Sequence, residues 1–133
     1  MKKNGILNGP LSKVVASLGH TDRLVICDSG LPVPHNAEVI DLALTKNIPR
    51  FVDALSTIIE ELEVEEAVVA EEIVNKNEFV YKEIQFLLNG KKIRKVSHEK
   101  FKEMTKENGT TVFVRTGEAT PFANIILIAG VTF

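Results

Sequence analysis

Apolar residues recur along this chain with two periods, one typical of helices and one typical of strands. From Leu11 to Leu18 they follow the i, i+3, i+4, i+7 spacing of a helix, and Gly19 supplies its stop. From Arg23 to Cys27 a short β-branched run predicts a buried strand, and Asp28 follows it directly. The first helix and the first strand are thus separated by only a few residues.

The same alternation continues to the C-terminus. Further strands are predicted at Val39 to Leu44, Ala67 to Ala70, Lys92 to Val96, Thr111 to Arg115 and Asn124 to Val131. Further helices are predicted from the cap Asn47 through Glu63, from Phe79 to Leu88, and after the cap Ser97. This order predicts an α/β fold, a single layered domain over residues 1–133 with a largely parallel central sheet flanked by helices.

Composition narrows the class of protein. A chain of 133 residues suits one domain, and a 44% apolar share with 26% charged residues is ordinary for a globular protein. The net charge of −2 and the lack of a lysine and arginine run argue against nucleic-acid binding. No apolar stretch has the length of a membrane span or a signal peptide, and the single cysteine, Cys27, is expected in the core. We therefore expect a cytoplasmic protein that binds no membrane.

Polar residues that could carry chemistry lie where the predicted strands end. Asp28 follows the first strand, His98 the fourth, and the segment from Arg115 to Glu118 the fifth. In open parallel sheets ligands bind at this edge. His20 precedes the first strand, so it is expected at the opposite end of the sheet. It could join the same site only through loop geometry or a neighbouring subunit.

The residue types leave several roles open. Imidazole can exchange a proton near neutral pH, so His20 and His98 are candidate acids or bases, although a lone histidine is more often structural. In the first turn of a helix, His98 would be favoured in its neutral form. Asp28 could bind a hydroxyl or only form a turn, and His35, in a proline-flanked loop, is expected to be solvated.

Several classes of site lack their motifs. No H-x-x-x-H or H-E-x-x-H pair occurs, which argues against a metal site. Neither nucleotide-phosphate loop is present, nor a G-x-S-x-G nucleophile elbow. The glutamate clusters EELEVEE and AEE are interpreted as the solvated face and end of a helix.

Three segments together resemble the ribose pyranase and fucose mutarotase family along almost the whole chain. They are NGILNGPLSKVVASLGHTDRLVICDSGLPVP, IDLALTKNIPRFVDAL and RTGEATPFANIILIAGVTF. The resemblance implies a cofactor-free enzyme that opens β-pyranose ribose and closes it as β-furanose, the form that ribokinase phosphorylates. It also implies a ring-shaped assembly, commonly a decamer of two pentamers, with sites near subunit boundaries.

The family's functional residues can be carried over by position. His20, in GHTD, matches the proton donor. The sugar-binding positions match Asp28 in CDSGLP, His98 in VSHE, and Phe122, Ala123 and Asn124. Family members often have tyrosine where Phe122 stands, so one hydroxyl is lost here, although a phenyl ring can still stack on a sugar.

The sequence therefore predicts a metal-free mutarotase acting on D-ribose. Two alternatives stay open. One is a mutarotase for fucose or another monosaccharide, because one ring substituent changes only a few contacts. The other is a non-catalytic sugar-binding module, which the absent tyrosine hydroxyl at Phe122 motivates.

Overall fold

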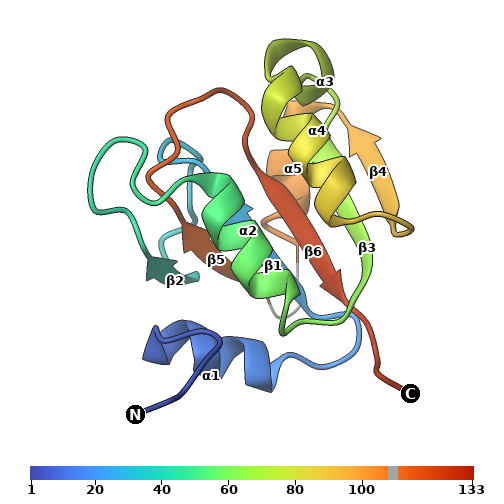
Figure 1. Ribbon diagram of the computed structural model, residues 1–133. Helices are drawn as coiled ribbons and strands as arrows, with labels where there is room; N and C mark the ends of the chain where they lie inside the picture. The colour runs from blue at the N-terminus through green and yellow to red at the C-terminus, as the bar shows by residue number, and fades with distance from the viewer. Residues whose placement is uncertain (108–110) are drawn as a thin grey trace.

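Six strands form one mixed sheet in the computed structural model, which describes residues 1–107 and 111–133 (Figure 1). Its order is β2-β5-β1-β6-β3-β4. The strands are β1 (Arg23–Cys27), β2 (Glu38–Asp41), β3 (Val64–Ala70), β4 (Lys92–Val96), β5 (Thr111–Arg115) and β6 (Ile125–Ala129). Neighbouring strands are parallel except where β6 runs antiparallel to β1 and β3. The predicted α/β fold with a largely parallel sheet is confirmed.

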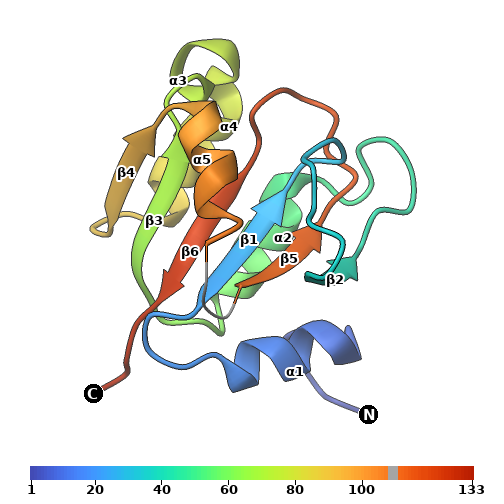
Figure 2. The ribbon, with the colours of Figure 1, turned by 180° about the vertical axis from the view of Figure 1, so that it is seen from behind.

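Helices cover both faces of the sheet. They are α1 (Gly9–Ser17), α2 (Phe51–Ile59), α3 (Ile73–Lys76), α4 (Glu78–Leu87) and α5 (His98–Met104). Apolar residues of α1, α2 and α4 pack into one core cluster, in front of the sheet in Figure 1. Residues of α5 pack into a second cluster on the other face, seen in Figure 2. The result is three layers, with the strand ends left free to carry loops.

The side chains of the central strand β1 alternate between the two core clusters. Leu24 and Ile26 belong to the cluster under α2, while Val25 and Cys27 belong to the cluster under α5. This is the two-residue period of a strand that is buried on both faces. Cys27 is fully buried, and burial, with a smaller contribution from the charge of Asp28, raises the pKa of its thiol to about 12. The expected core role of Cys27 is confirmed.

The second helix begins later than the sequence predicted. Asn47 does not cap it: its backbone φ is 63°, and its side-chain Oδ1 accepts a hydrogen bond from the backbone N–H of Ala119. The cap is Arg50, whose backbone N–H donates to the Asp53 carboxylate. Pro49 explains the difference, because a residue that precedes proline is disfavoured in the helical region, which stops a helix from running through Ile48.

Two further predictions were wrong. The sequence placed the glutamates of EELEVEE on a helix, whereas Glu65 and Glu66 lie on β3. Val64 and Ala67 are both buried on this strand, and the register shift between Val64 and Glu66 breaks the alternation of apolar and polar residues that would have identified it. The short helix α3 was not predicted, since four residues carry too little periodicity to be recognised.

No helix in the described ranges has both the length and the apolar character needed to cross a bilayer.

Candidate active site

Three loops meet at the carboxyl edge of the sheet and enclose a small pocket. They are the loop after β1, the start of α5 after β4, and the loop that leads into β6. The pocket has a volume of about 200 Å3. It is lined by Asp28, Gly30, Leu31, Pro32, His98, Phe122 and Asn124. The predicted sugar-binding residues therefore come together, although Ala123 does not line the pocket and its side chain lies in the core.

Asp28 and Asn124 form a reciprocal pair across neighbouring antiparallel strands. The Asn124 Oδ1 accepts from the Asp28 backbone N–H at 2.9 Å, and the Asn124 Nδ2 donates to Asp28 Oδ2 at 3.2 Å. The other carboxylate oxygen of Asp28 accepts from the Gly30 N–H at 2.9 Å. Each carboxylate oxygen can accept more than one hydrogen bond, so both keep capacity for a ligand hydroxyl.

The surroundings of Asp28 shift the pKa of its carboxyl group. Burial raises its pKa from the ordinary value of 3.8, and this effect exceeds the lowering by the Gly30 and Asn124 hydrogen bonds and by the nearby His98. Asn124 is itself only 1% exposed. A partly desolvated carboxylate held by an amide is a strong acceptor for a neutral hydroxyl donor.

His98 begins α5, as predicted. Ser97 caps this helix, since its hydroxyl accepts from the Lys100 N–H at 3.1 Å. The backbone N–H of His98 donates to both oxygens of Glu72, each at 3.0 Å, and its ring packs edge-on against Phe122 with the centroids 5.0 Å apart. The Nδ1 atom is buried and has no hydrogen-bond partner among the described residues. An unpaired buried nitrogen is costly, so rotation of the ring that brought Nδ1 to a ligand hydroxyl in the pocket would stabilise it.

Phe122 adopts a left-handed backbone conformation, with φ of 58°. Such a conformation is uncommon outside glycine and asparagine, and it is held here by the surrounding loop. The turn is closed by the Asn124 N–H, which donates to the Phe122 carbonyl at 2.8 Å. The turn thereby brings the phenyl ring and the Asn124 amide into one pocket.

An ion pair between the buried Glu118 and the partly exposed Arg50 supports this loop. The Glu118 carboxylate is 1% exposed and accepts from Arg50 at 2.7 and 3.1 Å and from the Thr120 hydroxyl at 3.0 Å. The Glu118 carbonyl accepts from the Ser29 N–H and hydroxyl, next to Asp28. At Gly117 a Cβ atom would collide with the carbonyl oxygens of neighbouring loop residues, so only glycine fits. These contacts fix the loop that carries Phe122 and Asn124.

His20 lies at the opposite end of the sheet, as predicted. Its neighbour Thr21 donates its N–H to the carbonyl of Ala129, the last residue of β6. The five residues of β1 separate this end from Asp28, and at about 3.3 Å per residue this amounts to roughly 17 Å. One subunit therefore does not bring His20 to the pocket. In Figure 2 this end of β1 lies at the bottom, away from the loops of the pocket.

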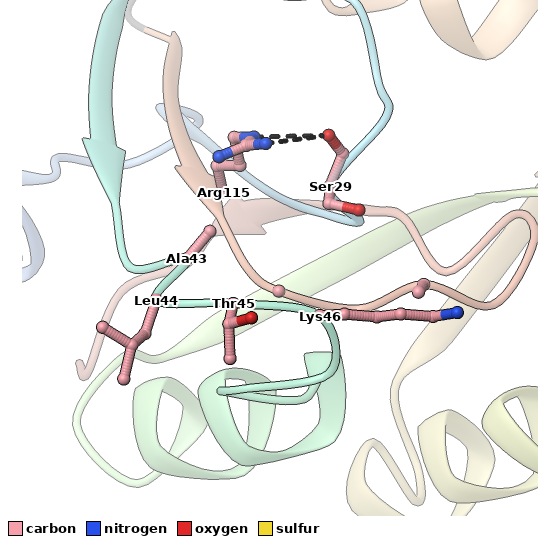
Figure 3. A pocket seen from close by; sticks show the side chains of 8 residues that line it. Ser29, Ala43, Leu44, Thr45, Lys46 and Arg115 are labelled. Atoms are coloured by element: carbon pink, nitrogen blue, oxygen red, sulfur yellow. Dashed lines mark hydrogen bonds between the residues drawn. The ribbon is translucent and has the colours of Figure 1, made fainter.

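A larger hollow of about 380 Å3 lies beside the candidate site (Figure 3). Arg115 points into it, but its guanidinium already donates to the Ser29 carbonyl and pairs with Asp41 at 3.1 Å. Its charge is thus neutralised within the chain. The smaller pocket is lined by His98 and by Asp28, whose pKa is raised by burial, and this makes it the better candidate despite its size.

Sequence reasoning missed two supporting residues of the site, Glu72 and Arg50, and the structural role of a third, Glu118. Glu72, Arg50 and Glu118 hold His98 and the loop before β6 through contacts between segments far apart in the chain. The alternation of apolar and polar residues does not reveal such pairs. The one signal available was Glu118 itself, because a carboxylate in a loop that follows a buried strand needs a partner.

The pocket combines a carboxylate, an imidazole nitrogen, an amide and an aromatic edge. Hydroxyl groups both donate and accept, so this set suits a small molecule with several hydroxyls. Its volume lies below the roughly 300 Å3 at which pockets for drug-sized ligands begin. Within the described parts of the chain, no three histidine, cysteine, aspartate or glutamate side chains are grouped so that they could hold a metal ion.

The sequence matches the RbsD / FucU transport protein family over residues 1–132. The chain belongs to this family, which confirms the resemblance seen in the sequence segments.

Two relatives match the whole chain. The D-ribose pyranase of Geobacillus thermodenitrificans is 54% identical over 133 residues, covering 100% of this chain and 99% of that protein. The D-ribose pyranase of Coprothermobacter proteolyticus is 53% identical and covers 100% of both.

Solved structures agree with the fold. The structure of Bacillus subtilis RbsD complexed with D-ribose has a TM-score of 0.94 and 47% identity, covering 100% of both chains. The fucose mutarotase of Streptococcus pneumoniae in complex with L-fucose has a TM-score of 0.78 and 24% identity, covering 96% of this chain and 95% of that chain. At the lower identity the likeness concerns the fold alone.

Proposed function

We propose that this chain is an isomerase that interconverts the β-pyranose and β-furanose forms of D-ribose. The observation that carries the proposal is its full-length similarity to the ribose-complexed RbsD of Bacillus subtilis, at a TM-score of 0.94. The relatives named D-ribose pyranase, about half identical over the whole chain, support the same activity. The pocket at the carboxyl edge supplies the hydroxyl-binding groups that such a reaction needs.

The reaction requires two proton movements in each half. Ring opening removes the proton from the anomeric hydroxyl, breaks the bond between C1 and the ring oxygen O5, and delivers a proton to O5. Closure forms the bond from O4 to C1, removes the O4 proton and protonates the carbonyl oxygen. Positioning decides which hydroxyl attacks, so binding of the open chain is as important as proton transfer.

Each pocket residue has a role in this scheme. Asp28 and Asn124 would hold sugar hydroxyls, the imidazole of His98 would bond another, and the Phe122 ring would pack on the sugar face. Ala123 would contribute through its backbone, since its side chain is buried in the core. His20 would be the general acid that completes the proton transfers.

The distance between His20 and the pocket requires a second copy of the chain. A contact in which the His20 end of one subunit meets the pocket of the next is heterologous, and such contacts form a ring when the rotation between neighbouring subunits closes. We therefore propose a cytoplasmic, ring-shaped homo-oligomer, a decamer of two pentamers, built from one mutarotase domain over residues 1–133. Catalysis by these side chains would use no metal and no cofactor.

Ribose ring exchange measured by NMR saturation transfer tests the activity directly. We expect purified protein to accelerate exchange out of the pyranose form, with equal rates in the presence and absence of a chelator. L-Fucose should be exchanged more slowly at the same concentration. Faster exchange of fucose would identify a different mutarotase, and tight ribose binding without acceleration would identify a sugar-binding module.

A Phe122→Tyr substitution tests the contribution of the missing hydroxyl. The ring already packs against His98 at the pocket, so the added hydroxyl should reach a bound sugar and lower KM by roughly twofold to tenfold, the value of one hydrogen bond. Phe122→Leu, which removes the aromatic face, should raise KM instead. Identical KM values in all three proteins would show that this side chain does not contact the sugar.

A further inference from the structure

His20 lies against a carboxylate. Its Nε2 is 2.6 Å from Oε2 of Glu65, a distance typical of a strong, charge-assisted hydrogen bond. We propose that Glu65 is the positioning residue for His20: it holds Nε2 and leaves Nδ1 as the ring nitrogen that exchanges protons with the substrate. This inference rests on the proposed function of the chain, because it assumes that His20 is the general acid.

A β-bulge places Glu65 beside the histidine. Along β3, Val64 pairs with Ala129 and Glu66 pairs with Ile128, so Glu65 is the extra residue between two consecutive pairs. A bulge turns a side chain out of the regular alternation of a strand. Its carboxylate thereby reaches over the end of β6 towards His20 in the turn before β1.

Gly130 makes room for this approach. Its N–H donates to the Glu63 carbonyl at 2.9 Å, just beyond the last pair of β3 and β6. A Cβ atom at position 130 would lie 3.3 Å from both Cβ and N of Glu65, closer than such contacts are usually found. Any larger residue would press on the segment that carries the carboxylate.

The turn before β1 fixes the other partner. Asp22 accepts from the Gly19 N–H through its side chain at 2.8 Å, and its backbone N–H donates to the Gly19 carbonyl. Thr21 has a φ of 71° and donates its N–H to Ala129, which anchors the turn to the end of β6. His20 therefore projects from a turn that is bonded on both sides.

The His20–Glu65 pair contributes little to the free energy of folding. The side chains of His20 and Glu65 are 51% and 56% exposed, and ion pairs this exposed contribute little to folding. Exposure instead leaves the ring accessible to a neighbouring subunit and its bound sugar. A bulge at Glu65, a glycine where a side chain would crowd it, and a 2.6 Å bond are more than an incidental surface contact needs.

The chemistry fixes which nitrogen is free. An ionised carboxylate only accepts hydrogen bonds, so Nε2 must be the donor to Glu65. Neutral His20 then carries its proton on Nε2 with a lone pair on Nδ1, and protonated His20 carries a second proton on Nδ1 that it can give to O5 of ribose. Carboxylates that fix an imidazole tautomer in this way are strongly required in acid-base catalysis.

Glu65→Gln tests the assignment, because the amide can present either a donor or an acceptor to Nε2. We expect kcat for ribose exchange to fall by roughly tenfold to a hundredfold, with KM changed by less than about twofold. Ring nitrogen NMR of 15N-histidine-labelled protein should show the Nε2–H tautomer of His20 in the unmodified chain and a mixture of tautomers in the variant.

Glu63→Gln is the matched control. Glu63 lies two residues away, is similarly exposed, and pairs with Lys91 at 2.6 Å instead of with a histidine. It should leave kcat and the His20 tautomer unchanged. An unchanged kcat in Glu65→Gln, or an Nδ1–H tautomer in the unmodified chain, would overturn the proposal. If the unmodified chain does not accelerate ribose exchange, the proposed function fails, and the tautomer alone decides whether Glu65 holds His20.

Discussion

Replacing His20 by alanine should lower kcat for ribose ring exchange by about 10²-fold to 10⁴-fold, the usual contribution of one general acid. The protein should stay folded, because the His20 side chain is half exposed and none of the core contacts depends on it. Asp28→Asn should also be impaired, by roughly tenfold to a hundredfold in kcat/KM, since it alters the pocket at the other end of the sheet. Each single variant is measured by the same saturation-transfer experiment.

Mixing the two variants in one oligomer should restore activity. If each site takes Asp28 from one chain and His20 from its neighbour, random mixing at equal amounts leaves about one quarter of the sites with both residues intact. Proteins with different tags can be co-expressed, isolated by tandem purification and assayed. Each variant co-expressed with itself is the control and should show only its own low residual activity, well below one quarter of that of the unmodified chain.

The absence of any recovery in verified mixed oligomers would contradict a site shared between chains. Recovery well above one quarter would also be informative, because it would indicate that the subunits assort non-randomly. A monomeric species with full activity in light scattering would contradict the shared site outright, because one subunit holds His20 and Asp28 at opposite ends of β1.

Local patterns were sufficient to predict most of the fold. The doubly buried strand Arg23–Cys27 and the stripe of α2 are recognisable because burial on a strand or a helix imposes a period on the sequence itself. The antiparallel course of β6 was not predicted, since nothing in Ile125–Ala129 distinguishes parallel from antiparallel pairing. Strand direction depends on how the long loop after β5 returns, which is a tertiary property.

Some residues of the candidate site could be predicted from the sequence, and others could not. Asp28 and His98 could be selected because they follow strands whose ends meet at one edge. Glu65 was misassigned to a helix, because a bulged strand breaks the alternation that identifies strands. The partnership of Glu72 with His98 joins residues 26 positions apart and leaves no local trace. Supporting residues are thus the least predictable part of the site.

Asp28→Asn should lower kcat/KM for ribose by roughly tenfold to a hundredfold, the value of a hydrogen bond to a charged group. The substituted amide keeps the shape of the side chain but turns one of its acceptors into a donor. It would face the Asn124 Nδ2, which now donates to Asp28 Oδ2. Isothermal titration with ribose should show the same loss in affinity. Unchanged affinity would exclude Asp28 as a sugar ligand.

The pH dependence of stability and of ribose affinity distinguishes the structural role of the Asp28 carboxylate from its role in binding. Asp28→Asn is the variant for this comparison. Burial raises the pKa of Asp28 above 3.8, so the folded chain holds this proton more tightly than the unfolded chain does. Its favourable contribution to the free energy of unfolding is present in full below pH 3.8 and is lost as the pH rises through the folded-state pKa.

Because asparagine does not titrate, thermal unfolding should show the stability of Asp28→Asn improving relative to the unmodified chain as the pH rises from 3.8 through the folded-state pKa of Asp28. Ribose affinity should move in the opposite direction in the unmodified chain, since the ionised carboxylate is the better acceptor and is lost on acidification. A stability difference that does not vary with pH would mean that Asp28 is no harder to ionise in the folded chain than in the unfolded one. Asp28 would then serve only to form the turn. No folding free energy would be spent on keeping its charge in the pocket for sugar binding.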